Sequence, residues 1–182
     1  MKDSLRRLYG HFTTITKHRH QVMIHCFKAG IPLQGLAHDL SKYMPEEFIP
    51  GIKYFAGDHS PNEGERIDKG YSRAWMHHKG RNKHHFEYWT DHNPKTKVYE
   101  PVPMPMRYVI EMFCDRVAAS RTYNGDNYTD AMPLEYLYRS KEYKLMHPET
   151  KKRLEKLLRM LRDKGEDATF DFIKEHLLKR KN

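Results

Sequence analysis

Histidine and aspartate residues occur along this chain in an order that suits a metal centre. The adjacent pair His38 and Asp39 follows His18 by twenty positions, and Asp115 comes much later. Neutral imidazoles and carboxylates are the side chains that bind divalent transition metals in proteins. These residues are therefore candidate metal ligands, provided that the fold brings their distant segments together.

A second group of candidates lies between them. The run from His77 to His85 contains four histidines, which is more than packing in a core requires. His78 is the first candidate for an additional ligand, and His85 or His84 is the next. With them the chain would bind two metal ions, which can hold both the attacking and the leaving oxygen of a displacement. One ion suffices if half of these histidines are surface groups or lie behind the ligands.

Helices must position these residues. Helical periodicity dominates the chain and no segment alternates as a strand would, so we predict an all-α protein with a single domain over residues 1–182. The predicted helices span about residues 4–29, 33–41, 106–123, 134–140, 148–164 and 166–179, and two more begin at Pro45 and near Ala74. Residues 57–70 should form a loop or a helix entry, and Gly80 should interrupt the helix that contains Ala74. Residues 93–105 carry four prolines and should form an extended surface connection, the best candidate for a mobile flap.

The first helix carries one of the candidate ligands. His11, His18 and His25 are spaced by seven residues, so they lie along one edge of its apolar stripe. His20 lies away from the centre of that stripe. This arrangement favours His18 as the histidine that faces inward.

The C-terminal part of the chain looks like an extension of a core formed by residues 1–125. In residues 126–182, two helices should pack as a hairpin through an apolar stripe. The stripe consists of Leu154, Leu157, Leu158, Leu161, Phe170, Ile173 and Leu177. We expect this extension to be structural or to form an oligomer interface, so a homo-oligomer stays open.

Composition limits the partners. The net charge of +9 attracts polyanions, which makes a nucleotide, a phosphorylated small molecule or nucleic acid a plausible ligand. The dense basic tract at residues 179–181 is expected to be a solvated tail rather than a nucleic-acid arm. No apolar run is long enough for a membrane span and the N-terminus has no signal region, so a cytoplasmic protein is expected. Cys26 and Cys114 form no disulfide framework.

The ordered set of His18, the His38–Asp39 pair, further histidines and Asp115 resembles the HD-domain superfamily of metal-dependent phosphohydrolases. The segment from Asp115 to Ala119 is similar to the Asp-Arg-Leu-Ala segment that is common in these enzymes. The resemblance implies an HD-like helical bundle in which His18, His38, Asp39 and Asp115 bind a divalent metal. Manganese, iron, cobalt, nickel and zinc all suit such ligands.

Residues 38–42, with Pro45 after them, are similar to the His-Asp-Ile-Gly-Lys…Pro element of one phosphodiesterase branch. The resemblance implies that Lys42 stabilises phosphate oxygens, although it could instead be a solvated lysine at a helix end. Ser41 stands where that branch has glycine, and its Gly-Tyr-Pro signature is missing. Cleavage of cyclic dinucleotides is therefore not predicted.

Nearly the whole chain also resembles a family of small bacterial and phage proteins without an established activity. The matching segments are residues 35–42, 74–89 and 104–121. Some members carry a catalase label. We reject this label, because no residue here follows a haem-ligation pattern and the chain is short for a haem enclosure.

We therefore hypothesise a metal-dependent phosphohydrolase that acts on a nucleotide or another phosphorylated small molecule through a metal-activated water. Asp39, Lys42 and Glu46 are the candidate catalytic residues, with Glu46 as a general acid or base. The candidate metal ligands are His18, His38, Asp39, His78, His85 and Asp115. The candidate substrate-binding residues are Lys42, Arg81, Asn82, Arg116 and Tyr88.

Two other classes of protein fit the same residues. A di-iron oxygenase of HD-like fold would use the surplus histidines to bind two irons. A non-catalytic protein that is stabilised by metal or binds nucleic acid would suit the net charge of +9. Trp75, Tyr88, Trp89 and Tyr123 could stack on a nucleobase, although core packing is the better expectation for both tryptophans.

Overall fold

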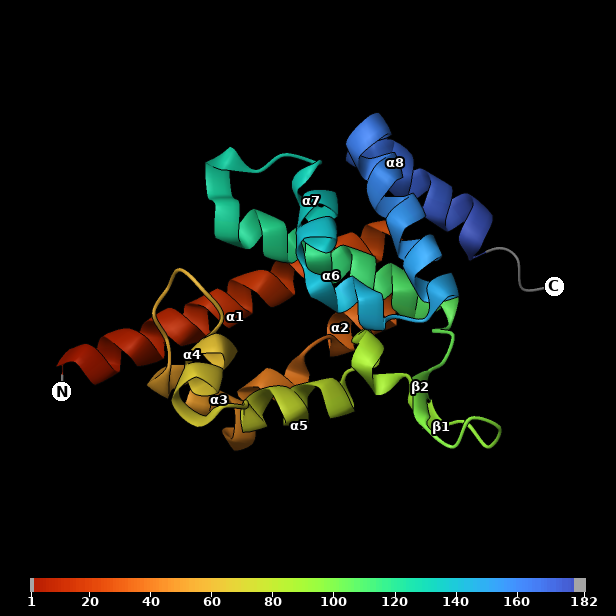
Figure 1. The fold of residues 1–182 in the computed structure, drawn as a ribbon. Coiled ribbons are helices and arrows are strands. Elements are labelled where there is room, and N and C mark those ends of the chain that lie inside the picture. Colours follow the sequence, from red (N-terminus) through yellow and green to blue (C-terminus); the bar gives the residue numbers. More distant parts are fainter. Residues whose placement is uncertain (1, 179–182) are drawn as a thin grey trace.

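The computed structural model describes residues 2–178, apart from the side chain of Glu142, and confirms the all-α class (Figure 1). The helices are α1 (Lys2–Lys28), α2 (Pro32–Ala37), α3 (Pro45–Lys53), α4 (Pro61–Lys69), α5 (Arg73–Arg81), α6 (Met106–Asn124), α7 (Met132–Arg139) and α8 (Pro148–Phe172). Shorter turns of helix are η1 (Leu40–Tyr43), η2 (Phe86–Tyr88), η3 (Gly125–Asn127), η4 (Lys141–Leu145) and η5 (Ile173–Leu177). The basic tract at residues 179–181 lies outside the described residues.

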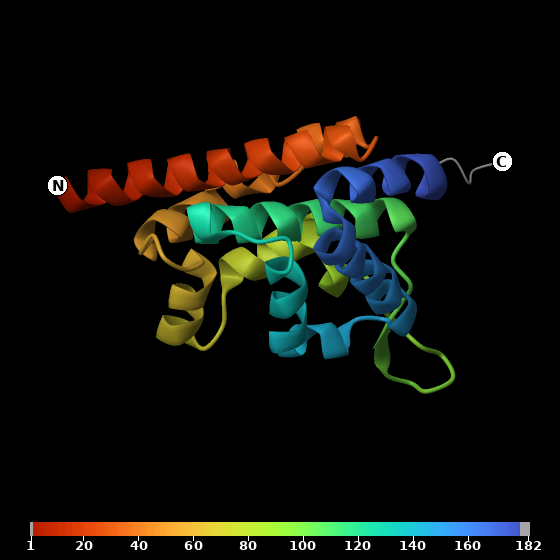
Figure 2. The ribbon, with the colours of Figure 1, turned by 90° about the horizontal axis from the view of Figure 1, so that it is seen from above.

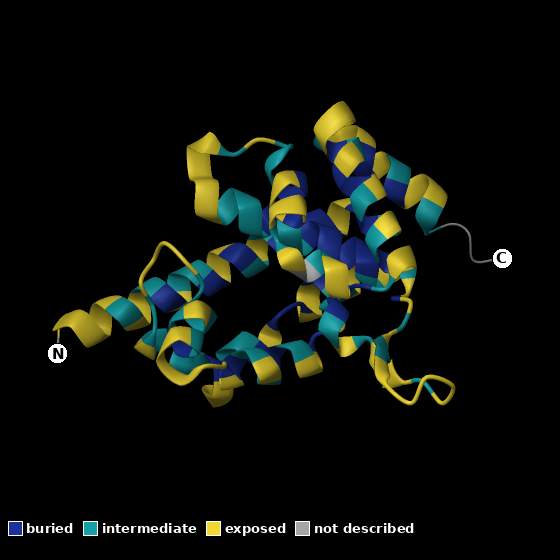
Figure 3. Ribbon diagram, in the orientation of Figure 1, coloured by how far each residue is buried: buried dark blue, intermediate teal, exposed yellow. Residues whose placement is uncertain are grey.

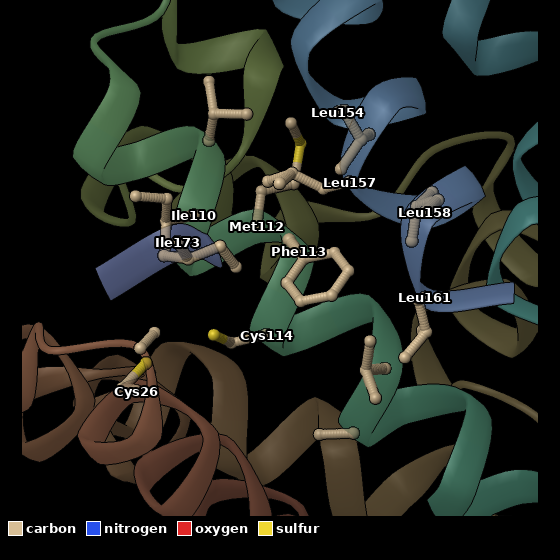
Figure 4. Packing of buried hydrophobic residues seen from close by; sticks show 14 of the residues in the cluster. Cys26, Ile110, Met112, Phe113, Cys114, Leu154, Leu157, Leu158, Leu161 and Ile173 are labelled. Carbon is tan, nitrogen blue, oxygen red and sulfur yellow. The ribbon is translucent and has the colours of Figure 1, made fainter. Parts of the chain in front are cut away.

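The core forms where α1, α6 and α8 meet. Helix α1 runs beside α6, and α8 packs against α6 as well (Figure 2). Buried residues concentrate at this junction (Figure 3). Phe113 and Cys114 of α6 lie between Cys26 of α1 and the leucines of α8 (Figure 4). Because the C-terminal leucines belong to the same apolar cluster as α1 and α6, residues 126–178 complete the core rather than stand beside it.

The predicted C-terminal hairpin depends on one glycine. Gly165 has φ 81° and ψ 177° inside α8, a conformation that interrupts the helical path. Leu154, Leu158 and Phe170 on the two sides of this kink are buried in the shared core. The chain therefore changes direction at Gly165, and the helical segments on both sides of it pack into the shared core.

The helix predicted for residues 33–41 is wrong in its second half. Helix α2 ends at Ala37, His38 is extended, and Asp39 has a left-handed backbone with φ 52°. The chain then enters η1. Left-handed backbone is uncommon for residues other than glycine, although aspartate tolerates it better than most. The His38–Asp39 pair thus lies in a break between two helices, where both side chains point into the interior.

Residues 57–70 contain the helix entry that the sequence allows: residues 61–69 form the helix α4, and Ser60 caps it by accepting a hydrogen bond from the backbone of Asn62. The prediction for Gly80 needs correction. Gly80 lies inside α5 and does not interrupt it; the helix ends at Arg81. A single glycine lowers helix stability by only about 1 kcal/mol, which packing can outweigh.

The connection between α5 and α6 contains the strands β1 (Thr90–His92) and β2 (Tyr99–Pro101), which pair antiparallel. No strand had been predicted there, because three-residue strands are too short to show an alternating pattern. The side chain of Glu100 binds Asn93 and Thr96, which ties the turn of this hairpin together. Nothing in the structure supports the predicted flap, since no residue of 90–105 lines the cavity described below.

None of the helices within residues 2–178 has the length and apolar character that crossing a membrane requires.

Candidate metal centre

Donor atoms from α1, the α2–η1 break, the end of α5 and α6 gather in the interior. Among the described residues they form three groups, each with ligand atoms within 4.8 Å of one another, and two of these groups share Asp39. The first group consists of His18, His38, Asp39 and Asp115, and the second consists of Asp39, His78, His84 and His85. Each group could hold a metal ion. The structure thus brings together all six residues predicted as metal ligands and adds His84 to them.

Asp39 belongs to both groups because its two carboxylate oxygens face different neighbours. Oδ2 lies 3.4 Å from Nε2 of His38 in the first group. Oδ1 lies 3.3 Å from Nε2 of His78 and 3.5 Å from Nε2 of His84 in the second group. Asp39 is 1% exposed, so these neighbours rather than water surround its carboxylate. A carboxylate in this position can bridge two cations.

The distances between donor atoms fit metal coordination. Two ligands bound about 2.1 Å from one ion at ordinary angles are about 3.0–3.4 Å apart. Nε2 of His18 lies 2.9 Å from Oδ1 of Asp115, and the three distances around Asp39 are 3.3–3.5 Å. Both groups are therefore compact enough to surround an ion.

Several of these donor atoms make no hydrogen bond within the described residues. Nε2 of His38, Nε2 of His84, Nε2 of His85 and Oδ1 of Asp39 are buried without a hydrogen-bond partner there. Buried polar atoms nearly always have a partner, because leaving one unpaired costs about 1–3 kcal/mol. Cations bound at the two groups would supply the missing partners of these four atoms. The donor set therefore fits a metal.

Carboxylates behind the ligands hold the histidine rings in place. Oε1 of Glu111 lies 3.0 Å from Nδ1 of His38 and 3.2 Å from Nδ1 of His84, so each ring can donate to this carboxylate while its Nε2 faces Asp39. A histidine bound to metal almost always donates its other N–H to such a group. His38, His84 and Glu111 also satisfy the distance criterion for a third metal group. We interpret Glu111 as a hydrogen-bond acceptor, because both Nδ1 atoms are already directed at it.

Glu47 has the same relation to the second group. Its Oε2 lies 2.7 Å from Nδ1 of His78, and its Oε1 lies 2.6 Å from Nδ1 of His77. The amide of Asn82 donates to Ser41 and to the backbone carbonyl of His78, which fixes the end of α5 against η1. His78 is thus oriented from two sides. His77 points away from the donor groups and toward Glu47.

The electrostatics of the site favour a cation. Burial alone would raise the pKa of Asp39 and Asp115, but the neighbouring histidines, and Lys42 beside Asp39, hold both values well below the usual range. Burial lowers the pKa of His18. Burial is also the main reason why the pKa of His85 lies well below its usual value, and the neighbouring His84 and His78 lower it further. Burial opposes protonation of His38 as well, yet the carboxylates of Asp39, Asp115 and Glu111 raise its pKa to about 10. His18 and His85 are thus held in the neutral form that binds metal, whereas the surrounding carboxylates favour a positive charge at His38, where a metal ion would replace the proton.

The donor groups lie on the wall of a cavity of about 900 Å³. Both groups reach its surface, through His18, Asp39 and Asp115 and through His78 and His85 respectively. The remaining wall is basic and aromatic in part. It includes Lys42, Arg66, Trp75, Arg116, Tyr123, Tyr136 and Arg139. Helix α7 thus contributes to this wall, which the sequence did not indicate for the C-terminal extension.

Lys42 and Arg116, both predicted to bind substrate, line the cavity. Nζ of Lys42 lies 2.7 Å from Oδ2 of Asp39, and this ion pair raises the pKa of the lysine despite its burial. Among the aromatic candidates, Trp75 and Tyr123 line the cavity, whereas Trp89 packs against the core.

Four other predicted site residues do not line the cavity. The side chain of Glu46 is 61% exposed, because α3 directs the next residue, Glu47, toward α5 instead. Arg81 is exposed at the end of α5, and Tyr88 is 39% exposed in η2. Asn82 is buried, but it supports His78 and does not face a ligand site.

Sequence reasoning missed Glu47 and Glu111 and chose His85 in preference to His84. The only sequence signal for Glu111 was its position four residues before Asp115, which places both carboxylates on one face of a helix. Glu47 had no signal that separated it from Glu46.

The chain was also compared with known proteins. Residues 7–160 match the family model described as Family of unknown function (DUF5662). No curated protein and no solved structure matches. The matched residues include both donor groups and the carboxylates behind them. Since the match covers most of its length, the chain belongs to this family.

Proposed function

We propose that this protein is a metal-dependent phosphohydrolase with an HD-like metal centre, acting on a nucleotide or another phosphorylated small molecule. One observation carries the proposal: two donor groups share Asp39 on the wall of a cavity that also presents Lys42 and two arginines from α6 and α7. Centres with two ions recur in enzymes that hydrolyse phosphate esters. The predicted resemblance to HD-domain enzymes points in the same direction.

The residues of the site have separable roles in this reaction. A metal bound by the two groups would supply Lewis acidity and lower the pKa of a coordinated water toward about 7. Asp39 and Asp115 would orient the attacking water, which adds to phosphorus as the bond to the leaving oxygen breaks. Lys42 would neutralise charge that develops on the phosphoryl oxygens, because its side chain lines the cavity beside Asp39.

The rest of the cavity suits a small phosphorylated molecule. A volume of about 900 Å³ falls within the range of pockets for small ligands. Arg116 and Arg139 provide further positive charge for phosphate, and Trp75, Tyr123 and Tyr136 provide rings on which a base or another planar group can stack.

A metal-dependent activity screen tests the proposal. The protein would be stripped of metal, reloaded separately with manganese, iron, cobalt, nickel or zinc, and assayed for phosphate release from a panel of nucleotides and sugar phosphates. We expect release with at least one metal, its loss in Asp39→Asn, and its retention in His20→Ala, because His20 is exposed. Metal binding without release from any phosphorylated compound would count against a phosphohydrolase.

A di-iron oxygenase is the second candidate, because the second group offers three imidazoles and one carboxylate, a set that suits non-haem iron. It predicts two irons per chain after aerobic purification and oxygen uptake with an organic substrate. The same preparation distinguishes a third outcome, in which metal only raises the melting temperature.

A further inference from the structure

We propose that Glu111 couples the two metal groups, so that metal binding at one group favours metal binding at the other. This inference rests on the metal centre of the proposed function, but it does not depend on which reaction the centre performs. Oε1 of Glu111 is within hydrogen-bond distance of His38, a member of the first group, and of His84, a member of the second. One oxygen atom therefore links both groups.

The environment of Glu111 leaves it little freedom. Its side chain is 8% exposed, and its second oxygen, Oε2, accepts a hydrogen bond of 2.7 Å from Nε2 of Gln34. Gln34 belongs to α2, which leads directly to His38 and Asp39. Glu111 also lies one helical turn before Asp115 on α6. A movement of the Glu111 carboxylate would therefore change the orientation of ligands in both groups.

The two imidazole nitrogens of each ring determine the direction of this coupling. In His38 and His84, Nδ1 is directed at Glu111, while Nε2 faces Asp39 and has no hydrogen-bond partner among the described residues. Metal binding at Nε2 requires the tautomer that carries its proton on Nδ1. That proton is donated to Glu111, which the first ion would therefore fix in the position that the second histidine needs.

Glu111 thus serves as a positioning residue for two sites, and removing its carboxylate should weaken metal binding at both. The loss of a carboxylate behind a metal-binding histidine typically costs about 10–100-fold in metal affinity. Coupling free energy is shared equally between two sites, so removing the Glu111 carboxylate should also reduce the cooperativity between the two binding steps to the part that the shared Asp39 contributes.

Glu47 provides a matched control. It is also a buried glutamate that contacts Nδ1 of histidines, but only His78 among its partners belongs to a donor group, and that group is the second. Glu47→Gln should therefore weaken one binding step by a similar factor and leave the other unchanged.

The experiment is a Co²⁺ titration of metal-free wild type, Glu111→Gln and Glu47→Gln, followed by calorimetry and by the visible absorption of bound cobalt. We expect two binding steps in the wild type. In Glu111→Gln both steps should weaken by about 10–100-fold and lose much of their cooperativity, and in Glu47→Gln only one step should weaken. Because the absorption spectrum reports ligand geometry, it should change at both steps in Glu111→Gln.

Other results would overturn the coupling role. Weakening of a single step in Glu111→Gln would make Glu111 specific to one group. Loss of one of three bound ions would make it a direct ligand of the third group. If Glu111→Gln does not fold, as judged by circular dichroism, Gln34→Leu is titrated instead. This substitution of a partly buried residue keeps the Glu111 carboxylate but removes the hydrogen bond to its Oε2. Both binding steps should then weaken by less than about 10-fold, and an unchanged affinity at either step would contradict the coupling role.

The same titration separates this inference from the proposed function. Coupled binding of two ions without any phosphate release would support the coupling and contradict the phosphohydrolase. An absence of metal binding in the wild type would overturn both.

Discussion

Lys42 interacts with a candidate metal ligand and also faces the cavity in which a substrate would bind. Its ammonium group is paired with Oδ2 of Asp39, the oxygen that faces the first donor group, and its side chain is 28% exposed on the cavity wall. The lysine therefore competes with a metal for one oxygen while it presents positive charge to a substrate. Metal binding and turnover should depend on it in opposite ways.

Replacing Lys42 by methionine tests this division of roles. Lys42→Met keeps the aliphatic stem but removes the charge, so metal affinity should stay the same or increase. Phosphate release should fall by about 10²-fold, as for the loss of one group that stabilises transition-state charge. Calorimetry and the activity assay measure the two effects separately. Parallel loss of metal and activity would show that the lysine only supports the site.

His11 is the residue for which the structure gives a clear pH dependence. It lies against the aromatic rings of Phe48 and Phe55, and a side-chain carbon on Gly51 would overlap with its ring. Burial, assisted by the charge of Lys42, lowers the pKa of His11 from 6.5 to about 4. The folded protein therefore keeps this ring neutral at a pH where the unfolded chain protonates it.

Acidification should destabilise the protein in part through His11. The unfolded state binds the proton below pH 6.5, whereas the folded state binds it only near pH 4, so stability falls as the pH decreases through this interval. The contribution is about 1–3 kcal/mol by pH 4. Urea unfolding at pH 7.5 and pH 4.5 should show a smaller loss for His11→Leu than for the wild type. His20→Ala, an exposed control, should show the full loss.

Two elements owe their shape to backbone conformations that the residue pattern alone does not reveal. The break between α2 and η1 places Asp39 in a left-handed conformation, which turns the carboxylate into the interior. The kink at Gly165 combines φ 81° with ψ 177°, a region that is essentially restricted to glycine. The first break builds the donor groups, and the second closes the C-terminal part of the core.

Substitution of two glycines should separate backbone strain from helix propensity. Gly165→Ala should destabilise the fold by about 1–3 kcal/mol, because alanine does not tolerate this conformation. A Cβ at Gly80 would meet no atom within 4 Å, so Gly80→Ala inside α5 should stabilise it by up to about 1 kcal/mol. Thermal unfolding measures both changes. Equal effects would mean that the kink at Gly165 is not required.

At the scale of the whole molecule, the metal centre and the fold should stabilise each other. The donor residues come from α1, the α2–η1 break, α5 and the segment after it, and α6, so an ion would add a direct link between elements that already meet through packing and hydrogen bonds. An ion that binds the folded state but not the unfolded chain stabilises it by mass action.

Metal should therefore raise the melting temperature. At a free metal concentration one hundred times the dissociation constant, the gain is about 2.7 kcal/mol, or about 5–10 °C for a chain of this size. Scanning calorimetry with and without a chelator measures it. The gain should shrink below pH 6, where protons compete for the imidazoles, and disappear in Asp39→Asn. A gain that survives in Asp39→Asn would place the metal elsewhere.

The sequence was sufficient for the features that have a local or ordered pattern. Periodicity predicted the all-α class and the apolar stripe of α8, because each depends on which side of one helix is apolar. Residue type and order selected His18, the His38–Asp39 pair and Asp115, whose donor atoms the structure brings together. These choices needed only the chemistry of each side chain and its position along the chain.

Only the tertiary structure could decide which polar residues face the centre. Glu46 and Glu47 are identical in type and adjacent in α3, and the packing of α3 against α5 turns Glu47 inward. Glu111 of α6 meets His38, in the α2–η1 break, and His84, in the segment after α5, although all three are far apart in sequence. Periodicity defines the apolar face of a helix, but the polar residues at its edge depend on how neighbouring helices are rotated and how they cross. That geometry arises from the packing of the whole core, and no local pattern records it.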